Sequence, residues 1–254
     1  MLKLKTETVI TPIGIITISH GRDEIFRLWC ASIRRLRSEV GWFPVVVAGD
    51  EQHKPICDEY DIYHWTRPNE PASRKWDDAM EVMMLDERKV KYVMISGSDD
   101  IISTALLKNI LSLSAQDYDL IGIKKIYFYC AEGLYKGRVR GIESKQFLGV
   151  CKTLHRRVIE KMGTLWTLDR SWGMDADCTR NTSPHIRTQA LAEGVVFDIK
   201  TNENLNRYTM VQNKETNEKN WPFEVEDTLL WTIIGDEEKQ ILKNYEKIGN
   251  YKRS

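Results

Sequence analysis

Strand-like and helix-like segments alternate through residues 13–115, and this alternation constrains the fold more than any other feature of the chain. Residues 13–18 and 92–95 are short apolar runs that predict buried strands. Residues 23–40 carry apolar side chains three and four positions apart, which predicts an amphipathic helix. Repeated strand–helix units with short links are typical of a parallel sheet covered on both faces, so we predict an α/β fold.

Further segments extend this pattern. Additional strands are predicted within residues 43–51 and 62–65, and additional helices at residues 55–60, 73–87 and 104–113. Beyond residue 115 we expect two strands joined by a turn at residues 131–133, a strand leading into a helix that ends at Gly163, a helix that ends at Gly194, a strand at residues 195–200 and a charged helix from Asp236 to about Tyr245. No internal repeat, low-complexity tract or Gly/Ser-rich linker interrupts the chain. Residues 1–254 are therefore expected to form one compact domain, with halves at 13–115 and 116–200 and a C-terminal extension at 201–254.

Charge and cysteine content argue against several classes of protein. Lys plus Arg and Asp plus Glu both number 37, so the formal net charge is zero and the whole surface cannot be basic enough to attract nucleic acid. The five cysteines are odd in number and form no Cys-x-x-Cys motif, which predicts reduced thiols. The N-terminal residues lack the apolar block of a signal peptide, and their longest uncharged run is too short to span a bilayer. We expect a soluble, cytoplasmic protein with no membrane partner.

Carboxylates are the remaining chemical signal, because several catalytic motifs are missing. The chain contains no phosphate-binding loop, no G-x-G-x-x-G after the first strand, no H-E-x-x-H and no G-x-S-x-G. The predicted strand at residues 92–95 runs directly into Ser-Gly-Ser and then Asp99-Asp100. Hard oxygen ligands of this kind suit Mg²⁺ or Mn²⁺ bound with a diphosphate. The alternative is that Ser98, Asp99 or Asp100 caps the helix that follows.

Three polar segments are predicted to lie at one edge of the sheet. In parallel α/β sheets, ligands bind beyond the carboxyl ends of the strands. Residues 19–22, Asp50-Glu51 and residues 96–100 each follow a predicted strand. We therefore expect these segments to form one rim.

The order of these segments resembles the GT-A fold glycosyltransferases, in particular the family-2-like group. The matching stretches are "SHGRDE", "AGDE", "SRKW", "SGSDD" and "WGMD", within residues 13–200. The resemblance implies a Rossmann-like, mostly parallel mixed sheet flanked by helices, with a nucleotide-sugar-binding half at 13–115 and an acceptor half at 116–200. One departure is Gly97, which stands where the family's metal motif usually begins with an aspartate. Ribose contact by that motif is then lost, and Ser96 or Ser98 could substitute.

The resemblance also implies roles for individual residues. A uridine-linked sugar donor would be bound by Thr17, Ser19, Arg22, Asp50, Arg74, Lys75, Ser98 and Asp99. A Mn²⁺ or Mg²⁺ cofactor would be held by Asp99, Asp100 and, further along the chain, His185. A lone histidine is more often structural or exposed, so the alternative that His185 binds no metal stays open.

A second acidic cluster, in "SWGMDADCTRN", matches the acceptor side of the family. By position Asp175 would be the general base on the acceptor hydroxyl, with Asp177 as the other candidate. Met174 replaces the acid that usually precedes this base. The alternative is that both aspartates are first-turn acids stabilised by the helix dipole. Trp172 could stack on a sugar or a base, or lie in the core.

A basic stretch suggests one acceptor. Lys136, Arg138 and Arg140 lie among aromatic residues, a combination that can follow a phosphate backbone and stack bases. A solvated hairpin is the simpler interpretation. The amino-acid sequence of this region is similar to that of compact glycosyltransferases of tailed phages. This resemblance implies an acceptor such as DNA with hydroxymethylated pyrimidines and a location in the host cytoplasm.

Two other functions remain open on the sequence. A nucleotidyltransferase also uses a parallel sheet and paired carboxylates, although the first loop here has a single glycine, Gly21. A sugar- or nucleic-acid-binding module that has lost catalysis would fit the departures at Gly97 and Met174.

Overall fold

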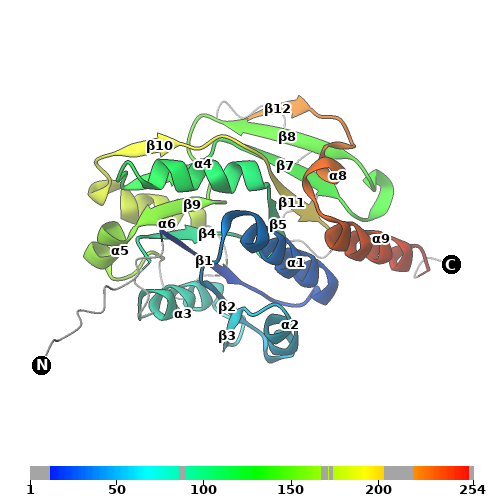
Figure 1. Cartoon of the computed structure of the whole chain (residues 1–254), viewed down its shortest axis with the longest axis horizontal. Coiled ribbons are helices and arrows are strands. Elements are labelled where there is room, and N and C mark those ends of the chain that lie inside the picture. The colour runs from blue at the N-terminus through cyan, green and yellow to red at the C-terminus, as the bar shows by residue number, and fades with distance from the viewer. Residues whose placement is uncertain (1–11, 86–89, 167–170, 172–173, 203–219, 252–254) are drawn as a thin grey trace, which may run out of the picture.

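A computed structural model describes residues 12–85, 90–166, 171, 174–202 and 220–251, and within them the chain forms two sheets (Figure 1). The first sheet contains, from edge to edge, β10 (Gln189–Leu191), β6 (Leu120–Gly122), β9 (Lys152–His155), β4 (Tyr92–Ile95), β1 (Ile13–Ile18), β2 (Val45–Gly49) and β3 (Tyr63–Thr66). The second sheet contains β12 (Asn220–Glu224), β8 (Val139–Ser144), β7 (Lys125–Cys130), β11 (Val196–Lys200) and β5 (Asp100–Ile102).

The helices lie between and after these strands. They are α1 (Asp23–Val40), α2 (Lys54–Glu59), α3 (Ala72–Leu85), α4 (Thr104–Ser114), α5 (Arg156–Met162), α6 (Met174–Thr182), α8 (Leu229–Ile233) and α9 (Asp236–Tyr251). Short 3-10 turns occur at Glu51–His53, Gly133–Tyr135 and Ser183–His185. Within the described residues, no helix is both long and apolar enough to cross a membrane.

The first sheet is mostly parallel, which confirms the predicted fold class. β1 pairs in parallel with β2 and β4, and β2 pairs in parallel with β3. β10 and β6 are parallel to each other, whereas β9 runs antiparallel to both β4 and β6. The predicted bounds of β1, α1 and β4 coincide with the observed ones.

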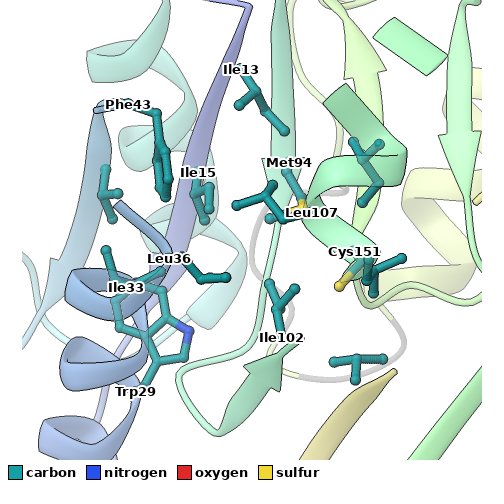
Figure 2. Close-up of a cluster of buried hydrophobic side chains, with 14 of the residues drawn as sticks. Ile13, Ile15, Trp29, Ile33, Leu36, Phe43, Met94, Ile102, Leu107 and Cys151 are labelled. Carbon is teal, nitrogen blue, oxygen red and sulfur yellow. The ribbon is translucent and has the colours of Figure 1, made fainter. Parts of the chain in front are cut away.

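Both faces of the sheet are buried at β1, whose side chains are apolar on both faces. Ile13 and Ile15 pack with Trp29 of α1 and Leu107 of α4, as Figure 2 shows. Ile16 points to the opposite face and packs in a second cluster with side chains of α3 such as Met80. A strand covered by helices on both faces reads as a continuous apolar run, as residues 13–18 do.

The chain crosses from the first sheet to the second at residues 96–99. β4 ends at Ile95, a turn closes with a hydrogen bond from Asp100 N to Gly97 O at 3.2 Å, and β5 begins at Asp100. The helix after β5 is capped by Ser103, whose Oγ accepts the N–H of Leu106 at 3.2 Å. The interpretation of Ser98, Asp99 or Asp100 as the helix cap is therefore wrong.

The predicted helix ending at Gly194 is also wrong. α6 ends at Thr182, and Pro184, which lacks a backbone N–H, lies in the 3-10 turn that follows. Asp119 then accepts hydrogen bonds from the backbone N–H groups of Arg187 and Thr188, just before β10. Those N–H groups are bound outside any helix, so the chain continues as a strand.

The C-terminal residues pack on the first half of the chain. α9 is longer than predicted and contacts α1, where Arg35 Nε donates to Glu238 Oε2 at 2.7 Å. Both partners are nearly buried, with side-chain exposures of 11% and 2%. All five cysteines are unpaired and buried, as expected for reduced thiols.

We predict that Asp119→Asn lowers the free energy of unfolding by about 2 kcal/mol at pH 7. Burial alone would raise the pKa of Asp119, but the N–H groups of Arg187 and Thr188 and the Arg157 guanidinium lower it to about 2, from an ordinary value of 3.8. A lowered carboxyl pKa stabilises the folded state above the unfolded-state pKa. The deficit of the variant should therefore be constant above about pH 4 and shrink between about pH 4 and 2.

Urea unfolding at several pH values measures this deficit. Asp58→Asn is the control, because Asp58 forms an exposed pair with Lys54 and should change stability by less than about 1 kcal/mol. A deficit that stayed the same down to pH 3 would contradict the assigned role of the Asp119 carboxylate.

Candidate functional site

Three carboxylates meet where the two sheets join. Asp99 lies in the turn after β4, Asp100 is the first residue of β5, and Asp198 lies on β11 directly opposite Asp100 in the antiparallel register. Each of the three offers one oxygen, and these oxygens all lie within 4.8 Å of one another. We call Asp99, Asp100 and Asp198 the acidic cluster.

Gly97 permits this arrangement. Its backbone N–H donates to Asp100 Oδ2 at 2.5 Å. A Cβ at this position would lie 2.8 Å from Asp100 Oδ2 and 2.9 Å from Asp99 Oδ1, closer than side-chain carbons approach other atoms. An aspartate at position 97 would displace both carboxylates, so its replacement by glycine is part of the site's geometry.

Two cations partly neutralise the acidic cluster. Arg22 Nη1 donates to Asp99 Oδ2 at 2.9 Å, and Lys200 Nζ donates to Asp198 Oδ2 at 2.5 Å. Burial and the neighbouring carboxylates raise the pKa of Asp100 well above its usual range. Burial also raises the pKa of Asp198 to about 6, although Lys200 opposes this shift. Both shifts mean that burial and the neighbouring carboxylates disfavour the charged forms of Asp100 and Asp198, which a bound cation would stabilise.

The acidic cluster is compatible with a divalent metal ion. Its oxygens all lie within 4.8 Å of one another, which is the range of distances between ligand oxygens around one small divalent ion. Asp198 Oδ1 is buried and has no hydrogen-bond partner among the described residues. A buried oxygen without a partner costs free energy unless a ligand binds it.

Asp175 faces the same pocket as the acidic cluster. The pocket has a volume of about 380 Å³, and its wall includes Asp175, all three cluster carboxylates and apolar side chains such as Phe128. Asp175 is exposed in the first turn of α6 and lies against Gly149, where a Cβ would come within 2.0 Å of its Oδ1. The structure thus brings one of the two predicted catalytic aspartates to the carboxylate pair, although they are far apart in sequence.

The predicted rim is held together by a buried lysine. Lys75 Nζ is fully buried and donates to Asp50 Oδ1 at 2.8 Å and to the carbonyl of Ser19 at 2.7 Å. Burial lowers the pKa of Lys75, although Asp50 opposes this. The other oxygen of Asp50 lies 2.6 Å from His20 Nδ1 and accepts the Gly21 N–H at 3.3 Å. These contacts shape the loop that presents Arg22 to Asp99.

The other predicted donor residues line the same rim or lie below it. Thr17 is fully buried, and its hydroxyl makes a long 3.4 Å contact with the carbonyl of Ile18. Ser19 Oγ lies 2.7 Å from His53 Nδ1. Ser98 is half-buried in the turn next to Asp99, and Arg74 is half-buried near the start of α3.

Several predicted site residues lie elsewhere. Asp177 is buried, forms an ion pair with Arg180 and is not part of the pocket wall. His185 lies in the 3-10 turn after α6 and does not belong to the acidic cluster, where Asp198 is the third member. Trp172 lies outside the described residues.

The predicted acceptor residues lie on or next to the β7–β8 hairpin. Lys136 Nζ donates to the carbonyl of Glu246 in α9 at 2.6 Å, and Arg138 Nη1 donates to Asp227 Oδ2 at 3.0 Å. Arg140 is half-buried on β8. Two of the three basic residues thus attach the hairpin to the C-terminal part of the chain.

Sequence reasoning missed Asp198 and Lys200. The signal was present in "VVFDIK", where an acid and a lysine two positions apart interrupt an apolar strand. Residues two apart share one face of a strand, and charged residues are rarely buried without a partner or ligand. A buried pair at the end of the second half therefore pointed to a functional position.

Comparison with known proteins shows the fold. No protein-family model and no curated protein matches the chain. Among solved structures, TarS residues 1–349 from S. aureus match with a TM-score of 0.55, 11% identity, and coverage of 74% of this chain and 60% of that one. Longer TarS matches with a TM-score of 0.59 and 12% identity, covering 92% of this chain and 43% of that one.

A third match is the mannosyltransferase PcManGT from Pyrobaculum calidifontis, solved with GDP-Man and Mn²⁺. It has a TM-score of 0.50 and 12% identity, and covers 79% of this chain and 62% of that one. The chain thus spans less than two thirds of the length of these structures. Because these neighbours are GT-A glycosyltransferases, the chain has a GT-A, glycosyltransferase-like fold.

We predict that Gly97→Ala destabilises the protein by about 1–3 kcal/mol, because the added methyl group overlaps the Asp99 and Asp100 carboxylates. Urea unfolding at pH 7 measures the change. Ser98→Ala is the matched control, since Ser98 is half-buried in the same turn, and it should change stability by less than about 0.5 kcal/mol. Equal stability of the two variants would show that position 97 tolerates a side chain.

Proposed function

We propose that this chain is a metal-dependent glycosyltransferase that moves a sugar from a nucleotide-sugar donor, with uridine diphosphate as the leaving group, to an acceptor hydroxyl. The observation that supports this most strongly is the shared pocket of about 380 Å³ between the acidic cluster and Asp175. In a GT-A fold, this combination supplies a diphosphate site and a base within one cavity.

Asp99, Asp100 and Asp198 would hold Mn²⁺ or Mg²⁺. Asp198 would be the third ligand, a role for which the sequence suggested His185. The metal would neutralise the charge that develops on the leaving diphosphate. Arg22 supplies a further positive charge at the same edge, because it lies 2.9 Å from Asp99. The contacts of Asp50 with Lys75, His20 and the Gly21 N–H fix the loop that carries Arg22.

Donor contacts are proposed at the rim rather than below it. Ser98 and Arg74 remain candidates for the nucleotide, since both are half-buried beside the loop ends. Thr17, Ser19, Asp50 and Lys75 have polar atoms engaged within the protein, so their proposed role is to shape the donor site.

Asp175 is the proposed general base. A base must reach the acceptor hydroxyl directly, and Asp175 has an exposed carboxylate on the pocket wall. It would accept the hydroxyl proton as the oxygen attacks the sugar carbon that carries the diphosphate. Asp177 is buried against Arg180, so it is the weaker candidate.

The DNA acceptor has little support in the hairpin contacts. Lys136 donates to the Glu246 carbonyl, and Arg138, although its side chain is 69% exposed, is paired with Asp227. Two of the three cations are thus already engaged within the protein, whereas a phosphate backbone needs cations that are free to bind it. We therefore retain an acceptor hydroxyl in the proposed function without assigning it to DNA.

A thermal-shift panel of nucleotide sugars, with and without Mn²⁺, tests the proposed function. One uridine-linked sugar should raise Tm in the presence of Mn²⁺ and be slowly hydrolysed. Release of pyrophosphate from a nucleoside triphosphate would instead identify a nucleotidyltransferase. No effect of any nucleotide sugar would favour a non-catalytic protein.

We predict that Asp198→Asn weakens Mn²⁺-dependent binding of the donor at least tenfold, because it removes one oxygen anion from the acidic cluster. The shift of donor affinity with Mn²⁺ concentration measures this. Asp58→Asn, which removes an exposed carboxylate paired with Lys54, should leave it unchanged. If Asp198→Asn kept the wild-type Mn²⁺ dependence, Asp198 would not be a ligand.

We predict that Asp175→Asn retains donor binding but slows donor hydrolysis by about 10²–10⁴-fold, the range expected for the loss of a general base. The readout is nucleoside diphosphate release at saturating donor. Glu160→Gln, at an exposed acid paired with Arg156 on α5, is the control and should hydrolyse the donor at the wild-type rate. Unchanged hydrolysis by Asp175→Asn would remove this residue as the base.

A further inference from the structure

A second pocket, of about 450 Å³, is lined by basic side chains. Its wall contains Lys124, Lys145, Lys152 and Arg187, together with Thr179 and Phe147. Among the described residues, the wall includes no aspartate or glutamate. We call this cavity the basic pocket.

Lys152 is the buried cation of this pocket, and no carboxylate among the described residues is paired with it. It is 2% exposed, and its Nζ donates to the Thr179 hydroxyl at 2.7 Å. Within the described residues no carboxylate forms an ion pair with it, in contrast to Lys75 and Lys200, which are paired with Asp50 and Asp198. Burying a charge without a counter-charge is costly, so a wall of this composition favours an anionic ligand.

The other cations are held beside Lys152. Lys124 lies over the Phe147 ring, with its Nζ 5.7 Å from the ring centre. The backbone N–H of Arg187 donates to Asp119 at 2.8 Å, so the chain at this residue is fixed while its side chain is exposed. Several cations around one small volume suit a phosphate group, which can accept hydrogen bonds from several donors at once.

The basic pocket adjoins the pocket that holds Asp175. Lys152 on β9 lies directly opposite Ile95 on β4, and Ile95 is part of the wall of that other pocket. Thr179 lies one helical turn after Asp175 in α6, and its hydroxyl donates to the Asp175 carbonyl at 2.8 Å. Four residues of helix span roughly 6 Å, so one residue from each pocket wall, Asp175 and Thr179, lies within the length of a small molecule of the other.

We propose that the basic pocket binds the phosphate of a hydroxyl-bearing phosphate ester, and that this ester is the acceptor. Its phosphate contacts Lys152, Arg187 and the neighbouring lysines, and this positions its hydroxyl toward Asp175. The acceptor role rests on the proposed function, whereas phosphate binding does not.

The first experiment measures phosphate binding by the full chain without donor or metal. Inorganic phosphate is titrated by calorimetry at constant ionic strength, with chloride as the reference anion. The wild type should bind phosphate, and Lys152→Met and Arg187→Gln should each bind it at least tenfold more weakly. Lys125→Gln is the matched control, because Lys125 is exposed, pairs with Glu143 and lies outside the basic pocket.

Arg187→Gln also guards against misfolding, since its side chain is exposed, whereas Lys152 is buried. Phosphate binding no stronger than chloride binding would overturn the inference. Equal phosphate affinity in the wild type, Lys152→Met and Arg187→Gln would overturn it as well.

A second experiment distinguishes the sources of the phosphate. Glycerol 3-phosphate should compete with inorganic phosphate and, with donor and Mn²⁺ present, increase donor consumption above the hydrolysis rate. Binding of inorganic phosphate alone would overturn the acceptor role. Tighter binding of a single-stranded oligonucleotide at equal phosphate concentration, lost in Lys152→Met, would identify a nucleic-acid acceptor and overturn the small-ester assignment.

The two proposals fail in different ways. A phosphate site in a protein that acts on no nucleotide sugar would overturn the proposed function and the acceptor role together. Donor hydrolysis without a phosphate site would overturn the present inference alone.

Discussion

The antiparallel pairing of β11 with β5 is the interaction on which the candidate site depends. It places Asp198 opposite Asp100, at the point where the chain leaves the first sheet after β4. Gly97 leaves room for this arrangement, since a Cβ at this position would require the carboxylates of Asp99 and Asp100 to shift. One strand pair and one glycine thereby gather three acids that electrostatic repulsion would otherwise keep apart.

The buried lysines of this molecule have two kinds of partner, a carboxylate or a neutral hydroxyl. Lys75 and Lys200 are each paired with an aspartate, and these pairs border the acidic cluster and its rim. Lys152 is as buried as they are, yet it contacts the Thr179 hydroxyl. The acidic cluster therefore favours a cation and the basic pocket an anion. The cluster lies on the second sheet where it joins the first, and the basic pocket borders β6, β9 and β10 of the first sheet.

Much of the fold could be predicted because its strands and helices are encoded locally. The apolar run at residues 13–18 and the 3/4 spacing at residues 23–40 identify β1 and α1 with their observed bounds. The predicted helix ending at Gly194 is absent because Asp119, from a distant part of the chain, accepts hydrogen bonds from the N–H groups of Arg187 and Thr188. A contact of this kind leaves no periodic pattern in the segment that it redirects.

The sequence by itself determined the α/β class, the rim of polar loop ends and the candidacy of Asp99, Asp100 and Asp175. The reason is that the alternation of strands and helices along the chain, and the polar residues that follow the strands, can be recognised from local patterns. Only the tertiary structure placed Asp198, rather than His185, beside Asp99 and Asp100, and placed Asp175 but not Asp177 on the pocket wall. It also showed that Lys75 is fully buried. The physical reason is that these outcomes depend on register between distant strands and on burial. Both are properties of packing, and neither is contained in any single segment.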